Sequence, residues 1–189
     1  IYAIDSRLTI TNSEIIENET TGDDERGGGI YFTKSGSDDY GINIIENSTI
    51  SGNKSKEASA IFANEGVKLR LNRVVIDNNY TSGTSNGTIY IKGAKVSILN
   101  SVIVNNDYNT TVTPYSGMTG GLYILETEDA TSIVNTIIYG NKKPQLLFGS
   151  GVNKTVDIMY SNLEDGLDDY WIPEYNIYLN TNEELANHY

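Results

Sequence analysis

One short pattern recurs along the chain and constrains its fold more than any other feature. In each copy an Asn lies between two short apolar stretches, and a second Asn follows six residues later. The five Asn pairs are Asn12…Asn18, Asn47…Asn53, Asn72…Asn78, Asn100…Asn106 and Asn135…Asn141. A sixth copy, residues 156–166, carries Tyr160 in place of the first Asn. Copies recur every 25 to 35 residues, and self-similarity at that period without a helical pattern is typical of stacked β-repeats.

Apolar residues within each copy predict three short strands per repeat. The first strand is an apolar-aromatic-apolar triplet such as Ile30-Tyr31-Phe32, and the second and third flank the first Asn. The third position after that Asn is always apolar: Ile15, Ile50, Val75, Ile103, Ile138 and Leu163. Alternation with period two puts one set of side chains inside. The sequence therefore predicts an all-β parallel β-helix, a β-solenoid of about five to six coils with three strands each.

The repeated Asn has a structural explanation. Asn tolerates left-handed backbone angles at a tight corner, and stacked Asn amides can hydrogen-bond from one coil to the next, as in cross-β ladders. Both Asn columns are therefore predicted to be structural. A hydroxyl residue follows the first Asn in most coils and is predicted to face outward on the third strand: Ser13, Ser48, Ser101, Thr136 and Ser161.

Two places interrupt this frame. Asn43 occupies a position where an apolar residue is expected, and Lys68 and Arg70 fall on nominally inward positions. A buried, unpaired Arg is very unfavourable. A one-residue bulge or register shift is therefore predicted before Asn72.

Composition disfavours several classes of function. The net charge of −12 and the pI of about 4.4 argue against nucleic acids and anionic membrane surfaces as partners. The chain has no Cys, so neither disulfides nor thiolate metal sites are predicted. No apolar run has the length of a membrane span. The single His, His188, is close to the last residue, and no Ser-His or Cys-His arrangement is predicted.

The repeat predicts one domain over residues 1–166. Ile1 falls within a repeat, so the N-terminus of this domain is expected to be truncated. Residues 167–189 lack the repeat and carry the only Trp of the chain, Trp171, followed by Ile172 and Tyr178. Because the open end of a solenoid needs a cover for its unpaired edge, residues 167–189 are predicted to form a C-terminal cap.

Aromatic residues recur at the outward position of the first strand. We call this set the aromatic strip: Tyr2, Tyr31, Phe62, Tyr90 and Tyr123, followed by Leu147. If the register holds, the five rings line up on one flat face, and an exposed apolar patch of this kind marks a binding surface. Tyr offers an apolar ring and a polar tip, which suits sugar rings with apolar faces and hydroxyl rims. The alternative is that stacking of the rings only stabilises the sheet.

Two acidic loops flank the strand that contains Tyr31, namely residues 22–25 and 37–40. Clustered carboxylates bind calcium or act as an acid–base pair, so a polysaccharide hydrolase or lyase that uses these loops is an alternative function. Neither loop has the calcium-binding spacing of an EF-hand or of a nonapeptide repeat, and solvated loop charge is the simpler interpretation. No catalytic residue, metal ligand or cofactor is predicted.

The coils resemble those of right-handed parallel β-helix surface proteins of the pectin-lyase-like superfamily, in particular the adhesin-like kind with Asn-Ser-x-Ile-x-x-Asn coils. In this chain Asn12-Ser13-Glu14-Ile15…Asn18 is one such coil. Gly28-Gly29-Ile30 and Gly120-Gly121-Leu122 are similar to an element of polymorphic-outer-membrane-type repeats. The aromatic strip is similar in kind to the flat aromatic face of tapirin-type cellulose adhesins. The resemblance implies a right-handed helix, an extracellular or cell-surface location and a role in adhesion.

These observations favour an extracellular adhesion or carbohydrate-binding module that contacts an extended or insoluble, cellulose-like polysaccharide through the aromatic strip. The expected partner is a polysaccharide or cell-surface glycan, with a protein partner as a further option, and neither nucleic acid nor membrane insertion is expected. A hydrolase or lyase and a structural or protein-interaction stalk are the two alternatives.

Overall fold

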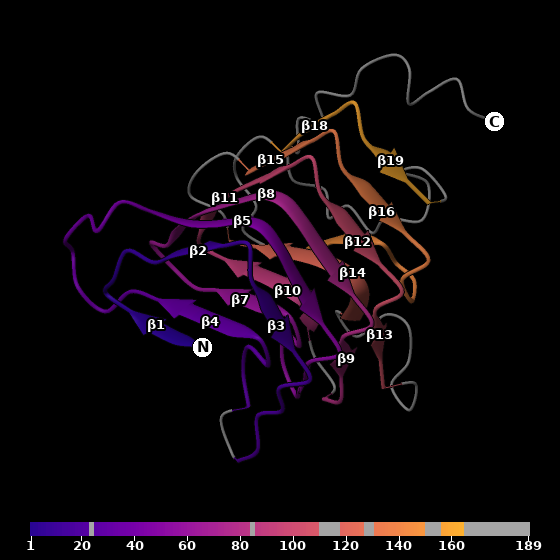
Figure 1. Cartoon of the computed structure of the whole chain (residues 1–189), viewed down its shortest axis with the longest axis horizontal. Helices are drawn as coiled ribbons and strands as arrows, with labels where there is room; N and C mark the ends of the chain where they lie inside the picture. Colours follow the sequence, from indigo (N-terminus) through magenta and orange to yellow (C-terminus); the bar gives the residue numbers. More distant parts are fainter. Residues whose placement is uncertain (23–24, 84–85, 110–117, 127–130, 150–155, 165–189) are drawn as a thin grey trace.

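The computed structural model describes residues 1–22, 25–83, 86–109, 118–126, 131–149 and 156–164. These residues form an all-β fold of parallel sheets that curl around one interior (Figure 1). The first sheet contains, in spatial order, β1 (Tyr2–Ile4), β4 (Ile30–Thr33), β7 (Ile61–Ala63), β10 (Asn86–Lys92), β14 (Met118–Leu125) and β17 (Leu146–Phe148).

The second sheet is the largest. It contains β2 (Thr9–Thr11), β3 (Glu14–Ile16), β5 (Ile42–Ser51), β8 (Lys68–Asp77), β11 (Lys95–Leu99), β12 (Val102–Val104), β15 (Thr131–Val134), β16 (Ile137–Tyr139), β18 (Val156–Met159) and β19 (Asn162–Leu163). The third sheet is short and contains β6 (Lys54–Ser55), β9 (Tyr80–Thr81) and β13 (Asp107–Tyr108).

The chain passes through these sheets in turn and then starts again beside the strand of the previous pass. We call each such circuit a pass: β4, β5 and β6 form one pass, and β7, β8 and β9 form the next. Every strand pair of the described residues is parallel. The predicted all-β, parallel organisation is therefore confirmed.

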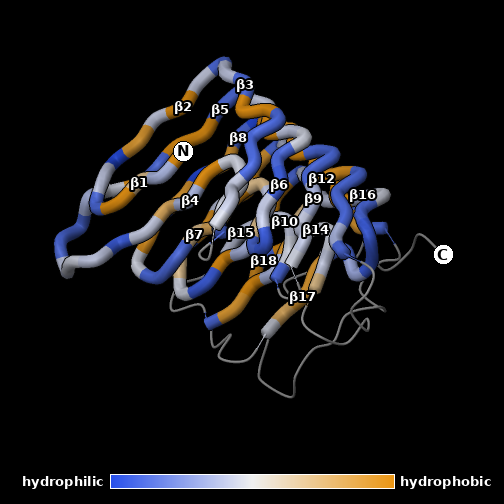
Figure 2. Tube along the Cα trace, turned by 90° about the horizontal axis from the view of Figure 1, so that it is seen from below, coloured by the Kyte–Doolittle hydropathy of each residue, from blue (hydrophilic) through white to orange (hydrophobic). Residues whose placement is uncertain are grey.

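The inward side chains of the sheets meet in one apolar core. Apolar and polar residues alternate along the strands (Figure 2), and in β5 this alternation buries Ile45 and Ile50 completely. The core runs through all passes, and its largest fully buried side chains include Phe32, Phe148, Ile30, Ile61, Leu71, Ile76, Ile89, Ile91, Ile98 and Ile103. Burial of one such side chain contributes about 1.5–3 kcal/mol, so the core is the main stabilising feature of the fold.

A buried column of Asn side chains links successive passes. The Asn53 backbone N–H and Nδ2 both donate to Asn79 Oδ1 at 3.0 Å, and Asn79 donates in the same way to Asn106. Each Nδ2 also reaches a strand carbonyl, as from Asn79 to Ile50 O at 3.0 Å. We call this column the Asn ladder: Asn18, Asn53, Asn79, Asn106 and Asn141. The predicted structural role of the second Asn is confirmed for Asn18, Asn53, Asn106 and Asn141.

In the third copy of the pattern the corner residue and the ladder residue each lie one position later than predicted. The ladder residue is Asn79 and not Asn78, which is exposed. The corner residue with positive φ is Arg73 (φ 53°), beside Asn47 (φ 49°) and Asn100 (φ 51°), and not Asn72. Consequently Ile76 is buried, whereas Val75 is 39% exposed. The predicted inward position of Val75 is wrong because the corner lies one residue later.

No bulge precedes this corner. β5 and β8 pair without a shift from Ile42↔Lys68 to Glu46↔Asn72, and the pairing continues in the same register at Ser48↔Val74. Leu69 and Leu71 therefore face the core, while Arg70 is exposed. The predicted bulge is wrong, because the one-residue correction of the frame already places the charged side chains outside.

The hydroxyl residues after the corner face inward, against the prediction. Ser48 is 4% exposed, and its Oγ accepts from the Ser13 backbone N–H at 3.1 Å and donates to Glu46 O at 2.8 Å. Ser101, Thr136 and Ser161 are also buried and make equivalent bonds to the carbonyl two residues earlier, as Ser13, which is half-buried, also does. The positive φ of the corner residue interrupts the strict alternation of side chains. The corner residue and the residue before it both point outward, and the hydroxyl residue after the corner points inward.

Asn43 is buried among apolar neighbours, as the interrupted pattern predicted. Its Oδ1 accepts from the Leu8 backbone N–H at 2.9 Å, and its Nδ2 donates to Lys68 O at 3.2 Å. These bonds satisfy the side chain where an apolar residue would otherwise pack. The predicted cap, residues 167–189, lies outside the described residues, as do residues 165–166 of the predicted repeat domain.

Candidate functional site

The aromatic strip forms as predicted. Tyr2, Tyr31, Phe62, Tyr90 and Tyr123 are register partners on β1, β4, β7, β10 and β14, and Leu147 continues the row on β17. The ring centroids of successive partners are 5.0, 4.9, 4.9 and 5.1 Å apart. This distance is close to the spacing of neighbouring strands, so the sheet itself brings the rings into contact.

Stacking leaves few ring faces for a ligand. The planes of Phe62 and Tyr90 differ by 11°, and those of Tyr31 and Phe62 by 15°. Each inner ring therefore has an aromatic neighbour on both faces, and only its edge and any hydroxyl point away from the sheet. Tyr2 is different because it has a neighbour on one side only, tilted by 32°. The free face that a sugar ring needs is available at Tyr2.

Exposure along the aromatic strip is uneven. Tyr2 is 63% exposed and Tyr31 is half-buried, but Phe62 and Tyr90 are only 3% and 6% exposed. Ala58 packs with Phe62 and Tyr90 in a small second cluster, which Leu125 also contacts. The expectation of a fully exposed strip is therefore not met at Phe62 and Tyr90. Burial raises the pKa of the Tyr90 hydroxyl far above its ordinary value, and the neighbouring Tyr123 adds to this shift.

Arg26 is a residue of the site that the sequence analysis did not select. Its guanidinium carbon lies 5.8 Å from the Phe62 ring centroid, and its Nε is 3.0 Å from Glu57 Oε2. Burial lowers the pKa of Arg26, but interactions with Tyr31 and Glu57 outweigh this effect and the net shift is upward. A lone Arg directly after an acidic run and before Gly27 is the signal that was available in the sequence.

A cavity of about 440 Å³ opens beside the exposed end of the strip. It is lined by Tyr2, Tyr31, Arg26 and Thr20, together with Ile1, Gly27 and Gly28. A volume of this size lies within the range of small-ligand pockets. The cavity thus combines an accessible aromatic face with a cation, a hydroxyl and backbone groups.

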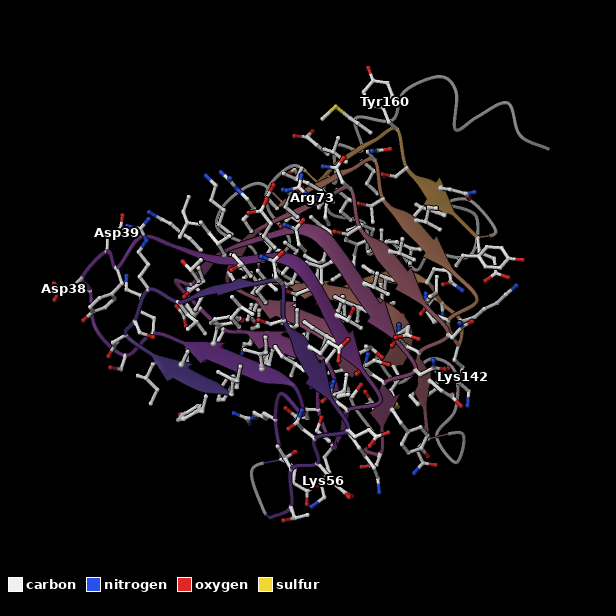
Figure 3. All side chains as sticks on the ribbon, viewed as in Figure 1. Asp38, Asp39, Lys56, Arg73, Lys142 and Tyr160 are labelled. Carbon is white, nitrogen blue, oxygen red and sulfur yellow. The ribbon has the colours of Figure 1, made fainter. Side chains whose placement is uncertain are left out.

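The acidic loops do not come together at Tyr31. Asp39 Oδ2 pairs with Lys68 Nζ at 2.6 Å, whereas Glu25 Oε1 pairs with Lys56 Nζ at 3.1 Å. Asp39 and Lys56 lie in widely separated parts of the molecule (Figure 3). Asp23 and Asp24 lie outside the described residues. Among the residues that are described, no group of three or more His, Cys, Asp or Glu side chains is arranged to hold a metal ion.

The loop between β4 and β5 is instead anchored by hydrogen bonds to carboxylates. Asp5 accepts from the Ser35 backbone N–H at 2.8 Å and from the Ser35 hydroxyl, and Asp39 accepts from the Gly41 N–H at 3.0 Å. The cavity beneath this loop measures only about 20 Å³, enough for a single water molecule. The hydrogen bond with Ser35 lowers the pKa of Asp5, and that with Lys68 lowers the pKa of Asp39.

This anchoring predicts a loop that loosens in acid. Both carboxyl pKa values are lower in the folded protein than the value of about 3.9 expected for the unfolded chain. The stabilisation is therefore fully present above about pH 4 and is lost as the pH falls through the folded-state pKa values. Amide-exchange protection of Ser35 and Gly41 should be constant from pH 7 to 5 and decrease below pH 4.

An Asp5→Asn/Asp39→Asn variant provides the control for this acid effect. It should show low protection of the same amides at every pH, because neither side chain can ionise. Protection that stays unchanged down to pH 2 in the unmodified protein would contradict the assignment.

The described residues contain no helix, and hence none that is long and apolar enough to cross a membrane. Comparison of the chain with protein-family models, with curated proteins and with solved structures gives no match.

Proposed function

We propose that the three curled sheets are the faces of a right-handed parallel β-helix of six coils, in which each pass is one coil. Successive residues of the Asn ladder are 35, 26, 27 and 35 residues apart, which supports one ladder residue per coil. The right-handed sense follows from the strong preference of parallel β crossover connections for that hand.

On this scaffold we propose an extracellular adhesion module that contacts a cellulose-like polysaccharide at the exposed end of the aromatic strip. The observation that carries the proposal is the cavity in which the 63% exposed Tyr2 lies beside Tyr31 and Arg26. A sugar ring can pack its apolar face on the free face of Tyr2, while its hydroxyls hydrogen-bond to Arg26 and to the Tyr31 hydroxyl. The contact surface is thus smaller than the full strip.

A pull-down on insoluble cellulose, chitin and xylan tests this proposal. The Tyr2→Ala variant should bind its glycan about tenfold more weakly, the equivalent of about 1.4 kcal/mol for one lost ring contact. Tyr139→Ala is the matched control, because Tyr139 is also exposed (54%) but lies on β16 in another sheet. Thermal unfolding should show that both variants fold, with a loss in Tyr2→Ala no larger than the stacking energy of one ring pair, about 0.5–1.5 kcal/mol. Equal binding by the Tyr2→Ala variant would move the contact surface elsewhere.

A second candidate is a structural or protein-interaction stalk. The burial of Phe62 and Tyr90 favours it, since these rings contribute stacking energy of about 0.5–1.5 kcal/mol per pair without any ligand. A folded protein that binds none of the three glycans would support this candidate. No observation on the described residues favours the hydrolase or lyase alternative. Glu25 and Asp39 belong to separate loops, and each carboxylate forms an ion pair with a Lys.

A further inference from the structure

The first pass forms an open edge. β1, β2 and β3 each pair with a strand on one side only, β4 for the first and β5 for the other two. Large apolar side chains are exposed here: Ile1 (54%), Tyr2 (63%), Ile4 (44%) and Ile16 (48%). The end of the core also reaches this edge, since Ile10 and Ile15 retain 9% and 7% exposure.

The Asn ladder ends at the same edge with a free acceptor. In the interior of the ladder each Oδ1 accepts two hydrogen bonds, from the backbone N–H and from the Nδ2 of the preceding ladder Asn. Asn18 donates to Asn53 Oδ1 at 3.0 Å and 2.8 Å, but no donor among the described residues reaches its own Oδ1. The first pass therefore presents the acceptor half of an interaction that is repeated throughout the molecule.

The opposite end of the ladder is closed. Gln145 Oε1 takes the place of a further Asn and accepts from the Asn141 Nδ2 at 2.7 Å and from the Asn141 backbone N–H at 3.3 Å. Gln145 Nε2 in turn donates to Asn141 O and to Glu164 Oε2, both at 2.9 Å. The donors at this end are therefore satisfied within the chain. Asn18, by contrast, is exposed and keeps a side-chain acceptor that no donor of the described residues reaches.

We infer that the edge formed by β1, β2 and β3 docks a further coil of the same repeat. The occupant is a parallel, extended segment with an apolar-aromatic-apolar triplet over Tyr2 and an Asn amide that donates to Asn18 Oδ1. The interface is continuous with those between the existing passes, which fixes its register. A second copy of this chain does not fit. Two such edges would oppose acceptor to acceptor, and the donors at the other end are bonded to Gln145.

The docked coil rests on the coil geometry of the proposed function and adds a second, competing use of its contact surface. A docked coil would stack its aromatic residue on the free face of Tyr2 and close the cavity lined by Tyr2, Tyr31 and Arg26. Sugar binding and coil docking are therefore mutually exclusive uses of one surface.

A fusion protein tests the docking. Residues 61–88, placed directly before Ile1, supply one complete coil. Ile61 and Ile89 are register partners one coil apart, and Ile61 also pairs with Ile30. Ile30 precedes Tyr31, the register partner of Tyr2, so Ile1 takes the position of Ile89 in the fusion. The amides of β1, β2 and β3 should exchange at least about tenfold more slowly in the fusion than in the unmodified full chain. The matched control is the same fusion with Asn79→Ala and Phe62→Ala in the added segment only, and it should show little added protection.

Two results would overturn the inference. One is unchanged exchange of the β1, β2 and β3 amides in the fusion. The other is concentration-dependent dimerisation of the unmodified chain, seen by sedimentation, that protects the same amides. Because exchange is measured without sugar, slower exchange supports docking even if the unmodified protein binds no glycan. Where the unmodified protein does bind one, the fusion should lose that binding.

Discussion

Replacing Asn79 by Ala is expected to lower the free energy of unfolding by about 3–5 kcal/mol. The Asn79 side chain is buried, accepts from the backbone N–H and Nδ2 of Asn53, and donates to Ile50 O and Asn106 Oδ1. Ala can replace none of these bonds, so the Asn53 N–H and the Ile50 carbonyl lose their partners in the interior. Each buried, unsatisfied polar group costs about 1–3 kcal/mol. Urea unfolding monitored by circular dichroism measures the loss.

Asn72→Ala is the matched control for this effect. Asn72 also belongs to a column of Asn hydrogen bonds, accepting from Asn100 Nδ2 at 2.9 Å and donating to Glu46 Oε1 at 2.8 Å, but this column lies at the surface. Water replaces the lost partners there, so a loss of at most about 1 kcal/mol is expected. Equal losses in the two variants would show that burial of the ladder is not the source of its contribution.

The Gly121→Ala variant is expected to lose about 4 kcal/mol or more, or to fail to yield soluble protein. Gly121 lies in β14, and a Cβ at this position would lie 1.9 Å from Gln145 O and 2.8 Å from Gln145 C. Both are backbone atoms of the segment that leads into β17, so the clash cannot be relieved by rotation of a side chain. The neighbouring sheet strands must separate to admit the methyl group. Thermal unfolding and soluble yield measure the effect.

Gly36→Ala provides the contrast. Gly36 is exposed, and the nearest atom to an added Cβ is the Tyr40 hydroxyl at 3.9 Å, an ordinary contact. Its replacement should change stability by no more than about 0.5 kcal/mol. A Gly121→Ala variant that unfolds at the same temperature as the Gly36→Ala variant would contradict the close approach of β14 and Gln145.

Local sequence was sufficient to predict a feature where the residue type at a position has only one structural role. Period-two alternation placed the aromatic strip, and the five rings are register partners as predicted. The ladder Asn residues were identified in four of the five complete copies. The third copy was shifted because Asn72-Arg73 and Asn78-Asn79 each offer two candidate positions, and only the pairing of β8 with β5 selects Arg73 and Asn79.

Neither the shortest strands nor the exposure of individual side chains could be predicted from local sequence. β6, β9 and β13 have two residues each, too few for a periodic signal, and they exist because Asn53, Asn79 and Asn106 hold the chain in register just before them. The hydroxyl column was assigned to the wrong face because the alternation was carried through a corner whose positive φ reverses it.

The sequence by itself determined that this chain forms parallel strands in a repeating order, with two columns of Asn residues and one row of aromatic rings. Those features depend on periodicity, which the one-dimensional order of residues contains. Only the tertiary structure decided which ring of the strip has a free face, that Arg26 joins Tyr2 and Tyr31 at one cavity, and that Gln145 closes one end of the Asn ladder while Asn18 leaves the other open. These features depend on which segments stack against each other. Stacked neighbours bury Phe62 and Tyr90, whereas Tyr2, at the edge of the sheet, stays exposed.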